Sequence, residues 1–159
     1  MHGGVKFTGP VLVDTDTLTE LEKLVPLAPL QQPHNLAAIR MMAQHAPQLP
    51  QVACFDTSFH RTQPWVAEVF GLPRHYMEQG VRRYGFHGLS YEYIASVLPT
   101  QDGGAKFERT VVAHLGNGAS MCALRDFKSV ATTMGLTPMD VWPWEHVVDP
   151  STLESCSTS

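Results

Sequence analysis

Residues 81–98, V-R-R-Y-G-F-H-G-L-S-Y-E-Y-I-A-S-V-L, constrain the fold more than any other stretch of the chain. The second half of this stretch carries apolar side chains at the spacing of one helix face, namely Tyr91, Ile94, Ala95 and Leu98. Ser90 stands where an N-cap belongs, and Pro99 follows as a stop signal. The pattern therefore predicts a helix that begins near Ser90 and ends before Pro99.

A turn precedes this predicted helix. Gly85 and Gly88 allow a tight turn and a close approach of the backbone to a ligand. His87 stands between them, beside the helix N-terminus, where N–H groups and the helix dipole favour an anion. From the residues alone, His87 is either a structural histidine in a turn or a ligand-binding group. We place Arg82 and Arg83 outside such a site, because adjacent residues of an extended segment face opposite ways.

The bulk composition narrows the class of protein. The 159 residues suffice for one ordinary core, and 43% hydrophobic with 16% charged residues is typical of a globular chain. A net charge of -4 argues against a nucleic-acid partner, and no apolar run has membrane-spanning length. The 3 cysteines are far apart, form no metal motif and indicate a reducing compartment. We therefore expect a cytoplasmic protein with neither a nucleic-acid nor a membrane partner.

The first half of the chain alternates short strands and helices. We expect a strand at 11–13 and a helix from about Leu18, with Thr17 and Glu20 at the spacing of a capping box. Three further elements are expected in chain order: a helix capped by Asn35 that ends before Pro47, a strand at 52–55, and a helix that opens at 63–64 and ends at Gly71. Asp56 follows the second strand, where α/β sheets place ligand groups, and the alternative is a turn aspartate that caps the next segment.

The second half changes to a β pattern. A polar, glycine-rich segment at 100–108 separates the two halves. Beyond it, 111–115, 120–124 and 129–133 are predicted to be three strands joined by the tight turns G-N-G and R-D-F-K. The G-N-G turn is either a plain hairpin turn or, with His114 before it, a cradle whose backbone N–H groups bind phosphate.

Several short motifs stand in order along the chain: H-G-G-x-K-F at 2–7, L-A-P-L at 27–30, F-D-T-S-F-H at 55–60, V-R-R-Y-G-F-H-G-x-S at 81–90, H-L-G-N-G-A-S at 114–120 and S-V-A-T-T-M-G-L-T-P at 129–138. This ordered set resembles the motifs of the acetate kinase family, which moves a phosphoryl group between ATP and a short carboxylate. The resemblance covers nearly all of residues 2–140.

The resemblance implies a fold and a domain organisation. The fold class is α/β, a partial acetate/sugar kinase–Hsp70–actin (ribonuclease H-like) fold. Residues 1–100 are expected to form the later part of a first, acetate-binding domain. Residues 108–140 are expected to form the opening β-strands of a second, nucleotide-binding domain, and residues 141–159 a tail that does not match the family.

The resemblance also assigns residues to the reaction, in which acetate attacks the γ-phosphorus of ATP in the presence of Mg²⁺ to give acetyl phosphate and ADP. It implies catalytic roles for Asp56 and His87. It implies binding of the substrate by Leu30, Phe86 and Pro138, and of the ATP phosphates by His114, Gly116, Asn117 and Gly118. No metal ligand of the family is expected to be retained. From the residues alone, Leu30 is equally a core leucine.

The chain departs from the family pattern at both ends. The phosphate-binding segment and the arginine that precede H-G-G in the family are absent, and Gly3-Gly4 alternatively forms a flexible terminus. After Asp140 the family expects G-L-x-M-G-T-R-x-G-x-x-D-P, whereas the chain continues V-W-P-W-E-H. One nucleotide inserted after the Asp140 codon lets the codons that follow encode the expected motif, arginine included. We hypothesise that residues 141–159 are out-of-frame text.

Two classes of function remain open from the sequence. One is a partial acetate kinase, with a propionate kinase as the close alternative because one methylene is worth only about 1–3 kcal/mol. The other is a non-catalytic remnant that at most binds nucleotide or partners. Because both arginines and the late Mg²⁺-binding glutamate of the family are missing, we expect the 159-residue chain to be inactive by itself. Full-length members of the family form homodimers, and we make no prediction of a dimer for this chain.

Overall fold

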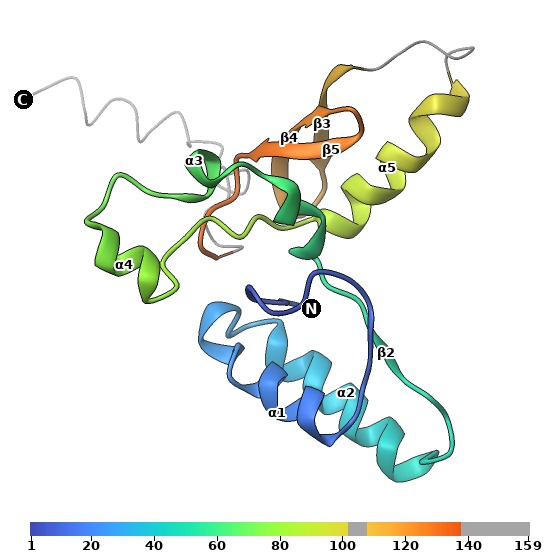
Figure 1. The fold of residues 1–159 in the computed structure, drawn as a ribbon. Coiled ribbons are helices and arrows are strands. Elements are labelled where there is room, and N and C mark those ends of the chain that lie inside the picture. Colours follow the sequence, from blue (N-terminus) through green and yellow to red (C-terminus); the bar gives the residue numbers. More distant parts are fainter. Residues whose placement is uncertain (102–107, 138–159) are drawn as a thin grey trace, which may run out of the picture.

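Two antiparallel sheets lie in different parts of the chain, of which the computed structural model describes residues 1–101 and 108–137. The first sheet has two strands, β1 (Val11–Leu12) and β2 (Val52–Ala53), and the second has three in the order β3-β4-β5. The small sheet lies with helices α1 and α2 at one end of the molecule, and the larger sheet lies beside α5 at the other (Figure 1).

Short helices occupy the chain between the strands. Their bounds are α1 Thr15–Glu22, η1 Val25–Leu27, α2 Gln32–His45, η2 Ser58–Thr62, α3 Trp65–Glu68, α4 Arg74–Glu78 and α5 Gly88–Gln101. The larger sheet consists of β3 Arg109–Leu115, β4 Ala119–Arg125 and β5 Lys128–Thr132. All five predicted strands are therefore present, and their ends differ from the predicted ones by no more than two residues.

The two N-terminal helices begin earlier than the sequence pattern predicts. Asp14 caps α1, because its Oδ1 accepts a hydrogen bond of 2.7 Å from the Thr17 amide, and Thr17 itself lies inside the helix. Helix α2 begins at Gln32, ahead of the predicted cap Asn35. Pro33 in the first turn of α2 has a backbone angle that already suits a helix, which explains the earlier start.

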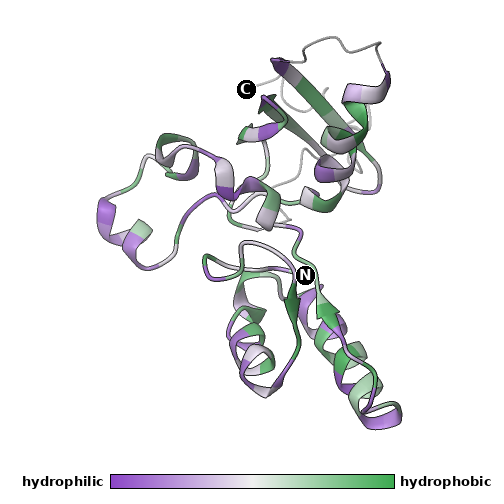
Figure 2. Cartoon of the chain, turned by 45° about the vertical axis from the view of Figure 1, so that its right-hand side comes forward, coloured by the Kyte–Doolittle hydropathy of each residue, from purple (hydrophilic) through white to green (hydrophobic). Residues whose placement is uncertain are grey.

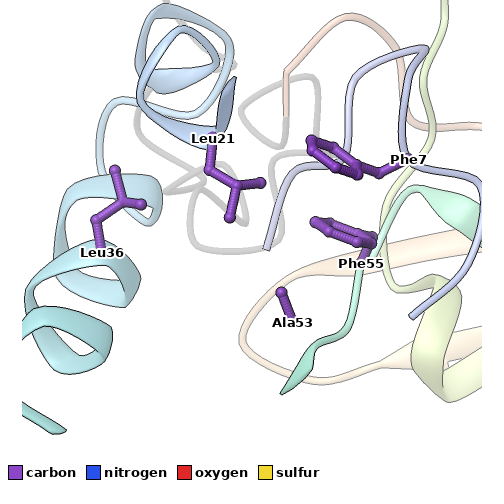
Figure 3. Packing of buried hydrophobic residues seen from close by; sticks show 5 residues of the cluster. All are labelled: Phe7, Leu21, Leu36, Ala53 and Phe55. Atoms are coloured by element: carbon purple, nitrogen blue, oxygen red, sulfur yellow. The ribbon is translucent and has the colours of Figure 1, made fainter. Parts of the chain in front are cut away.

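The first hydrophobic core joins the N-terminal turn to α1, α2 and β2 (Figure 3). Its buried members are Phe7, Leu21, Leu36, Ala53 and Phe55. The rings of Phe7 and Phe55 stack with centroids 4.9 Å apart and 12° between their planes. Gly3 is buried, and a Cβ on it would lie 2.9 Å from the Phe55 ring. The alternative interpretation of Gly3-Gly4 as a flexible terminus is therefore wrong, because this turn packs into the core.

Helix α3 is shorter than predicted. The predicted helix ran to Gly71, whereas α3 ends at Glu68 and Val69 is already extended. The Arg83 amide donates a 2.7 Å hydrogen bond to the Glu68 carbonyl, which a longer helix would need for its own next turn. Trp65, the first residue of α3, is 54% exposed.

Helix α5 is the element predicted from residues 81–98, with different ends. It begins at Gly88 rather than at Ser90, and Pro99 lies inside it rather than stopping it. Pro99 falls in the last turn, where the ring removes one backbone hydrogen bond close to the helix end. The early start has its cause in the site described below.

The larger sheet is a pair of hairpins. Leu115 pairs with Ala119 around the G-N-G turn, and Arg125 pairs with Lys128 around a two-residue turn. Asp126 and Phe127 form that second turn with φ of 50 and 63, the left-handed angles that match the twist of a tight hairpin. Much of the sheet is drawn in the hydrophobic colour in Figure 2. Both predicted turns are therefore confirmed.

A second core connects α5 with the sheet. Tyr91 and Ala95 of α5 are buried against Cys122 and Leu124 of β4. These contacts cross the predicted boundary between residues 100 and 108, and the division of the chain into domains stays a prediction. In the part of the chain that the structure describes, no helix is long and apolar enough to span a membrane.

Candidate active site

The N-terminal turn is held by side chains from distant parts of the chain. Gln32, at the start of α2, accepts from the His2 amide at 3.0 Å and donates to the His2 carbonyl at 3.3 Å. The Gly3 amide donates to Thr57 Oγ1 at 3.0 Å, and the Asp56 amide donates to the Met1 carbonyl at 2.8 Å. His2 is therefore fixed on both sides and lies next to Asp56.

Asp56 caps helix α5 from outside its sequence. Its carboxylate accepts hydrogen bonds from the amides of His87 at 2.9 Å and Leu89 at 3.4 Å, and its carbonyl accepts from the Gly88 amide at 2.8 Å. Ser90, the predicted cap, lies inside the helix, which begins at Gly88. The expectation of free N–H groups for an external anion is corrected too, because the Asp56 carboxylate itself is the anion at this helix N-terminus.

Gly88 makes this cap possible. A Cβ at Gly88 would lie only 2.2 Å from the Asp56 carbonyl oxygen, so no other residue fits without moving the backbone. His87 has a φ of 59, in the left-handed region that is uncommon for residues other than glycine. The strained angle and the cap together fix the direction of the His87 side chain.

Two imidazole rings form the centre of the site. His87 and His114 stack with centroids 4.0 Å apart and 21° between their planes. Nδ1 of His87 lies 2.8 Å from Ser120 Oγ, and Nδ1 of His114 lies 3.0 Å from Ser90 Oγ. Each ring is therefore anchored through Nδ1 by a serine, while Nε2 lies on the opposite side of the ring.

The tautomer of His87 follows from its neighbours. Burial raises the pKa of Tyr91, so the phenol keeps its proton. The Tyr91 hydroxyl contacts Ser120 Oγ, and we infer that it donates there. Ser120 then donates to Nδ1 of His87, which places the His87 hydrogen on Nε2. Burial, and then the neighbouring His114, lower the pKa of His87, so the ring is neutral at pH 7.

The G-N-G turn lies over both Nε2 atoms. A Cβ on Gly118 would lie 3.2 Å from Nε2 of His87, and one on Gly116 would lie 3.4 Å from Nε2 of His114. The Gly116 amide donates to the Gly118 carbonyl at 3.2 Å, so this amide is used inside the turn. Asn117 is exposed at its tip. The structure thus brings the predicted phosphate-binding turn within a few ångströms of the predicted catalytic histidine.

A cavity of about 270 Å³ opens between the N-terminal turn and His87. Among the residues that line it are Asp56, Phe86 and His87, together with His2, Gln31 and Asn35. Leu30 does not line this cavity and is 59% exposed, and its predicted role as a substrate-binding residue is untested. Pro138 lies outside the described residues. Sequence reasoning did not select His2, Gln31 or Asn35, although the first stands in the H-G-G motif.

A buried histidine supports Phe86. Nε2 of His60 donates to the Phe86 carbonyl at 2.9 Å, and its Nδ1 accepts from Ser129 Oγ at 2.9 Å. Gln63 donates to the same Ser129 hydroxyl at 3.0 Å. Burial lowers the pKa of His60 to about 4, so this neutral tautomer persists at pH 7. The network ties the backbone between Phe86 and His87 to strand β5.

The two arginines of the central motif have partners away from the cavity. Arg82 shares Glu68 with Arg61, and Arg83 donates to the carbonyls of Thr133 and Met134. Neither lines the cavity, and their predicted place outside the site stays a prediction. The segment is irregular rather than a strand, so these contacts, and not strand alternation, account for their positions.

The described residues do not form a metal centre. No group of three or more histidine, cysteine, aspartate or glutamate side chains is close enough to hold an ion in residues 1–101 and 108–137. Among the described residues, Asp56 is the only carboxylate that lines the cavity, and its oxygens already accept backbone hydrogen bonds. These residues therefore do not fit the Mg²⁺ ion that the resemblance implies.

The fold and site define an α/β protein that brings a helix-capping aspartate and two stacked imidazoles to the edge of a small cavity. The sequence model of the acetokinase family matches residues 1–141. Acetate kinases from Rhodopseudomonas palustris and Rhizobium meliloti are 57% and 51% identical to the chain, and the matches cover 88% and 91% of it.

Solved structures give the same result. A propionate kinase from Francisella tularensis matches with a TM-score of 0.86 and 38% identity, covering 99% of this chain and 42% of that one. The acetate kinase of Porphyromonas gingivalis matches with a TM-score of 0.78 and 37% identity, covering 86% of this chain and 35% of that one.

The chain belongs to the acetokinase family. The predicted fold class, a partial acetate/sugar kinase–Hsp70–actin fold, is confirmed by these neighbours. The chain spans 35% of the length of the Rhodopseudomonas palustris relative.

Proposed function

We propose that this chain is part of an enzyme that transfers a phosphoryl group between ATP and a short carboxylate, with acetate as substrate and acetyl phosphate and ADP as products. The observation that carries the proposal is the placement of His87 between the cavity and the G-N-G turn. One predicted carboxylate-binding residue, Phe86, lines that cavity, and the predicted phosphate-binding turn covers Nε2 of His87.

The described side chains have distinct roles in this proposal. Phe86 forms an apolar wall against the hydrocarbon end of the carboxylate. His87 donates from Nε2 to an oxygen of the transferred phosphoryl group, and His114 supports the His87 ring by stacking. Asp56 positions His87 through the cap on α5. Gly116, Asn117 and Gly118 contact the ATP phosphates through the turn.

Phosphoryl transfer depends mainly on alignment and on neutralising the charge of the equatorial oxygens. In the described part of the chain, no arginine or lysine lines the cavity. Mg²⁺ would supply charge neutralisation when bound, but the described residues do not hold it. The 159-residue chain alone is therefore expected to turn over ATP and acetate only at background rate, and a non-catalytic role of this chain is the second candidate.

The carboxylate is either acetate or propionate. A cavity of about 270 Å³ has room for both, and the similar solved structures include kinases named for each substrate. A methylene group changes binding by only about 1–3 kcal/mol, so the walls described here do not separate the two. A cytoplasmic location, as expected from the sequence, completes the proposal.

Two experiments test the proposal. In a thermal-shift assay of the 159-residue chain, ATP, acetate or propionate should each raise the midpoint temperature of unfolding if the folded chain binds it. His87→Ala should weaken the shift, whereas His34→Ala on the exposed part of α2 should leave it unchanged. A chain without any ligand-dependent shift, or with the same shift in both variants, contradicts the proposal.

Turnover is measured on the same sample by trapping acetyl phosphate with hydroxylamine. Background turnover supports the expected dependence on groups outside the described residues, and substantial turnover refutes it.

Resequencing the encoding DNA from the Ser129 codon past the Ser159 codon tests the out-of-frame hypothesis for residues 141–159. An intact reading frame as written contradicts that hypothesis.

A further inference from the structure

His2 has an unusual combination of burial and unmet hydrogen-bonding capacity. The residue is only 2% exposed, and its Nε2 is a buried polar atom without a hydrogen-bond partner among the described residues. Buried polar groups in folded proteins are nearly always paired, and the exceptions call for an explanation. His2 is also one of the residues that line the cavity, together with Phe86 and His87.

The protonation state of His2 can be assigned from its contacts. The Gly4 amide donates a 3.0 Å hydrogen bond to Nδ1, so Nδ1 carries the lone pair and the hydrogen of the neutral ring is on Nε2. Burial, together with the nearby N-terminus and Arg61, lowers the pKa of His2 to about 4, so the ring is neutral at pH 7. Nε2 is therefore an unpaired N–H donor.

The ring is held in place so that it cannot turn away to find a partner. Both main-chain groups of His2 are bonded to the buried side chain of Gln32. Its ring makes T-shaped contacts with the rings of Tyr84 and Phe86. The centroids are 4.7 and 5.5 Å apart, and the interplanar angles are 68° and 60°.

We propose that Nε2 of His2 donates a hydrogen bond to a carboxylate oxygen of the bound short carboxylate, and that His2 thereby selects a carboxylate over a neutral molecule of the same shape. The inference rests on the proposed function, because it assigns a further substrate-binding residue to the same cavity. Phe86 contacts the hydrocarbon end, and His2 contacts the charged end. A hydrogen bond from a fixed, desolvated donor to an anion is among the stronger ones in proteins.

The test observes the imidazole directly. The 159-residue chain, labelled with ¹⁵N-histidine, is titrated at pH 7 with acetate and propionate, and with acetone as the neutral comparator. Nε2–H of His2 should shift and saturate together with the ring resonances of Phe86, and acetone should bind at least about tenfold more weakly. Shifts of Phe86 that saturate without movement of His2 refute the inference and leave the proposed function intact, because the carboxylate then binds in the cavity without a hydrogen bond from His2.

Variants give a second readout. His2→Phe should weaken acetate binding by about tenfold or more, because it keeps the bulk and removes the donor. His2→Gln, whose side-chain amide nitrogen stands at the position of Nε2, should recover most of the affinity. His34→Phe at an exposed position is the matched control and should bind as the parent does. Equal affinity of His2→Phe and the parent overturns the inference, and the absence of any carboxylate binding overturns the proposed function with it.

Discussion

Acidification should destabilise this chain already above the pH range in which carboxylates titrate. His2 and His60 are buried, and burial lowers the pKa of each from 6.5 to about 4. The unfolded chain therefore binds protons on both rings between pH 6.5 and 4, while the folded chain does not. Since the folded pKa lies below the unfolded one, stability is full above pH 6.5 and is lost as the pH falls towards 4.

The magnitude follows from the two pKa values. Between pH 7 and pH 5 each ring lowers the free energy of unfolding by roughly 2 kcal/mol, since its pKa is 6.5 unfolded and about 4 folded. The two together remove about 4 kcal/mol, which is a large part of the 5–15 kcal/mol typical of a domain. The lowered pKa of His87 adds to the loss in the same direction.

Urea denaturation followed by circular dichroism, at pH 7, 6 and 5, measures this loss. His2→Gln and His60→Gln should each remove about half of the pH dependence, and the double variant most of it, whatever each change does to stability at pH 7. A parent chain that loses less than about 1 kcal/mol between pH 7 and 5 refutes the reasoning. A double variant whose free energy of unfolding falls with pH as steeply as that of the parent refutes it too.

Three further changes test the geometry around α5. Gly88→Ala should lower the free energy of unfolding, measured by thermal denaturation, by about 3 kcal/mol or more, because the new Cβ would lie 2.2 Å from the Asp56 carbonyl oxygen. The control Gly71→Ala, whose Cβ would have nothing within 4 Å, should change it by no more than about 0.5 kcal/mol. Asp56→Ala should cost about 1–2 kcal/mol through the lost cap, and a change below about 0.3 kcal/mol contradicts that role. Ser120→Ala should cost about 1–2 kcal/mol and mix the tautomers of His87, as seen in its ¹⁵N shifts; an unchanged single tautomer rules out the proposed donor order.

Local patterns predicted the strands and their turns well. The hairpins of the larger sheet join neighbours in sequence, and their turn residues G-N-G and R-D-F-K carry the conformational preference themselves. The apolar face of 91–98 likewise predicted a helix that packs on a core. The hairpin partners lie close together in the chain, and the apolar residues of one helix face recur at a fixed spacing, so local sequence contains the relevant information.

Helix boundaries were predicted less well, because the groups that set them lie elsewhere. The start of α5 is set by Asp56, 31 residues before His87, and not by Ser90. The end of α3 is set by the Arg83 amide, which takes the Glu68 carbonyl. A capping search along the helix's own sequence cannot find such partners.

In the candidate site, too, local sequence predicted some residues, and contacts between distant segments decided others. The order of motifs predicted roles for Asp56, Phe86, His87 and the G-N-G turn. The structure places the first three at the cavity wall and the turn beside the His87 ring. His2 was visible in a motif but gave no signal of a role. That signal is an unpaired nitrogen, which exists because Gly4 takes Nδ1 and no described group accepts a hydrogen bond from Nε2.

The sequence alone therefore determined the family, the kinds of chemical group available and the hairpins, because residue identity and short-range hydrogen bonding decide these. Only the tertiary structure decided which amides, carboxylates and imidazole nitrogens are already bonded and which remain available to a ligand. Hydrogen-bonding capacity is used up by whichever partner arrives within about 3 Å, and for Asp56, His60 and His2 at least one such partner comes from a different segment of the chain.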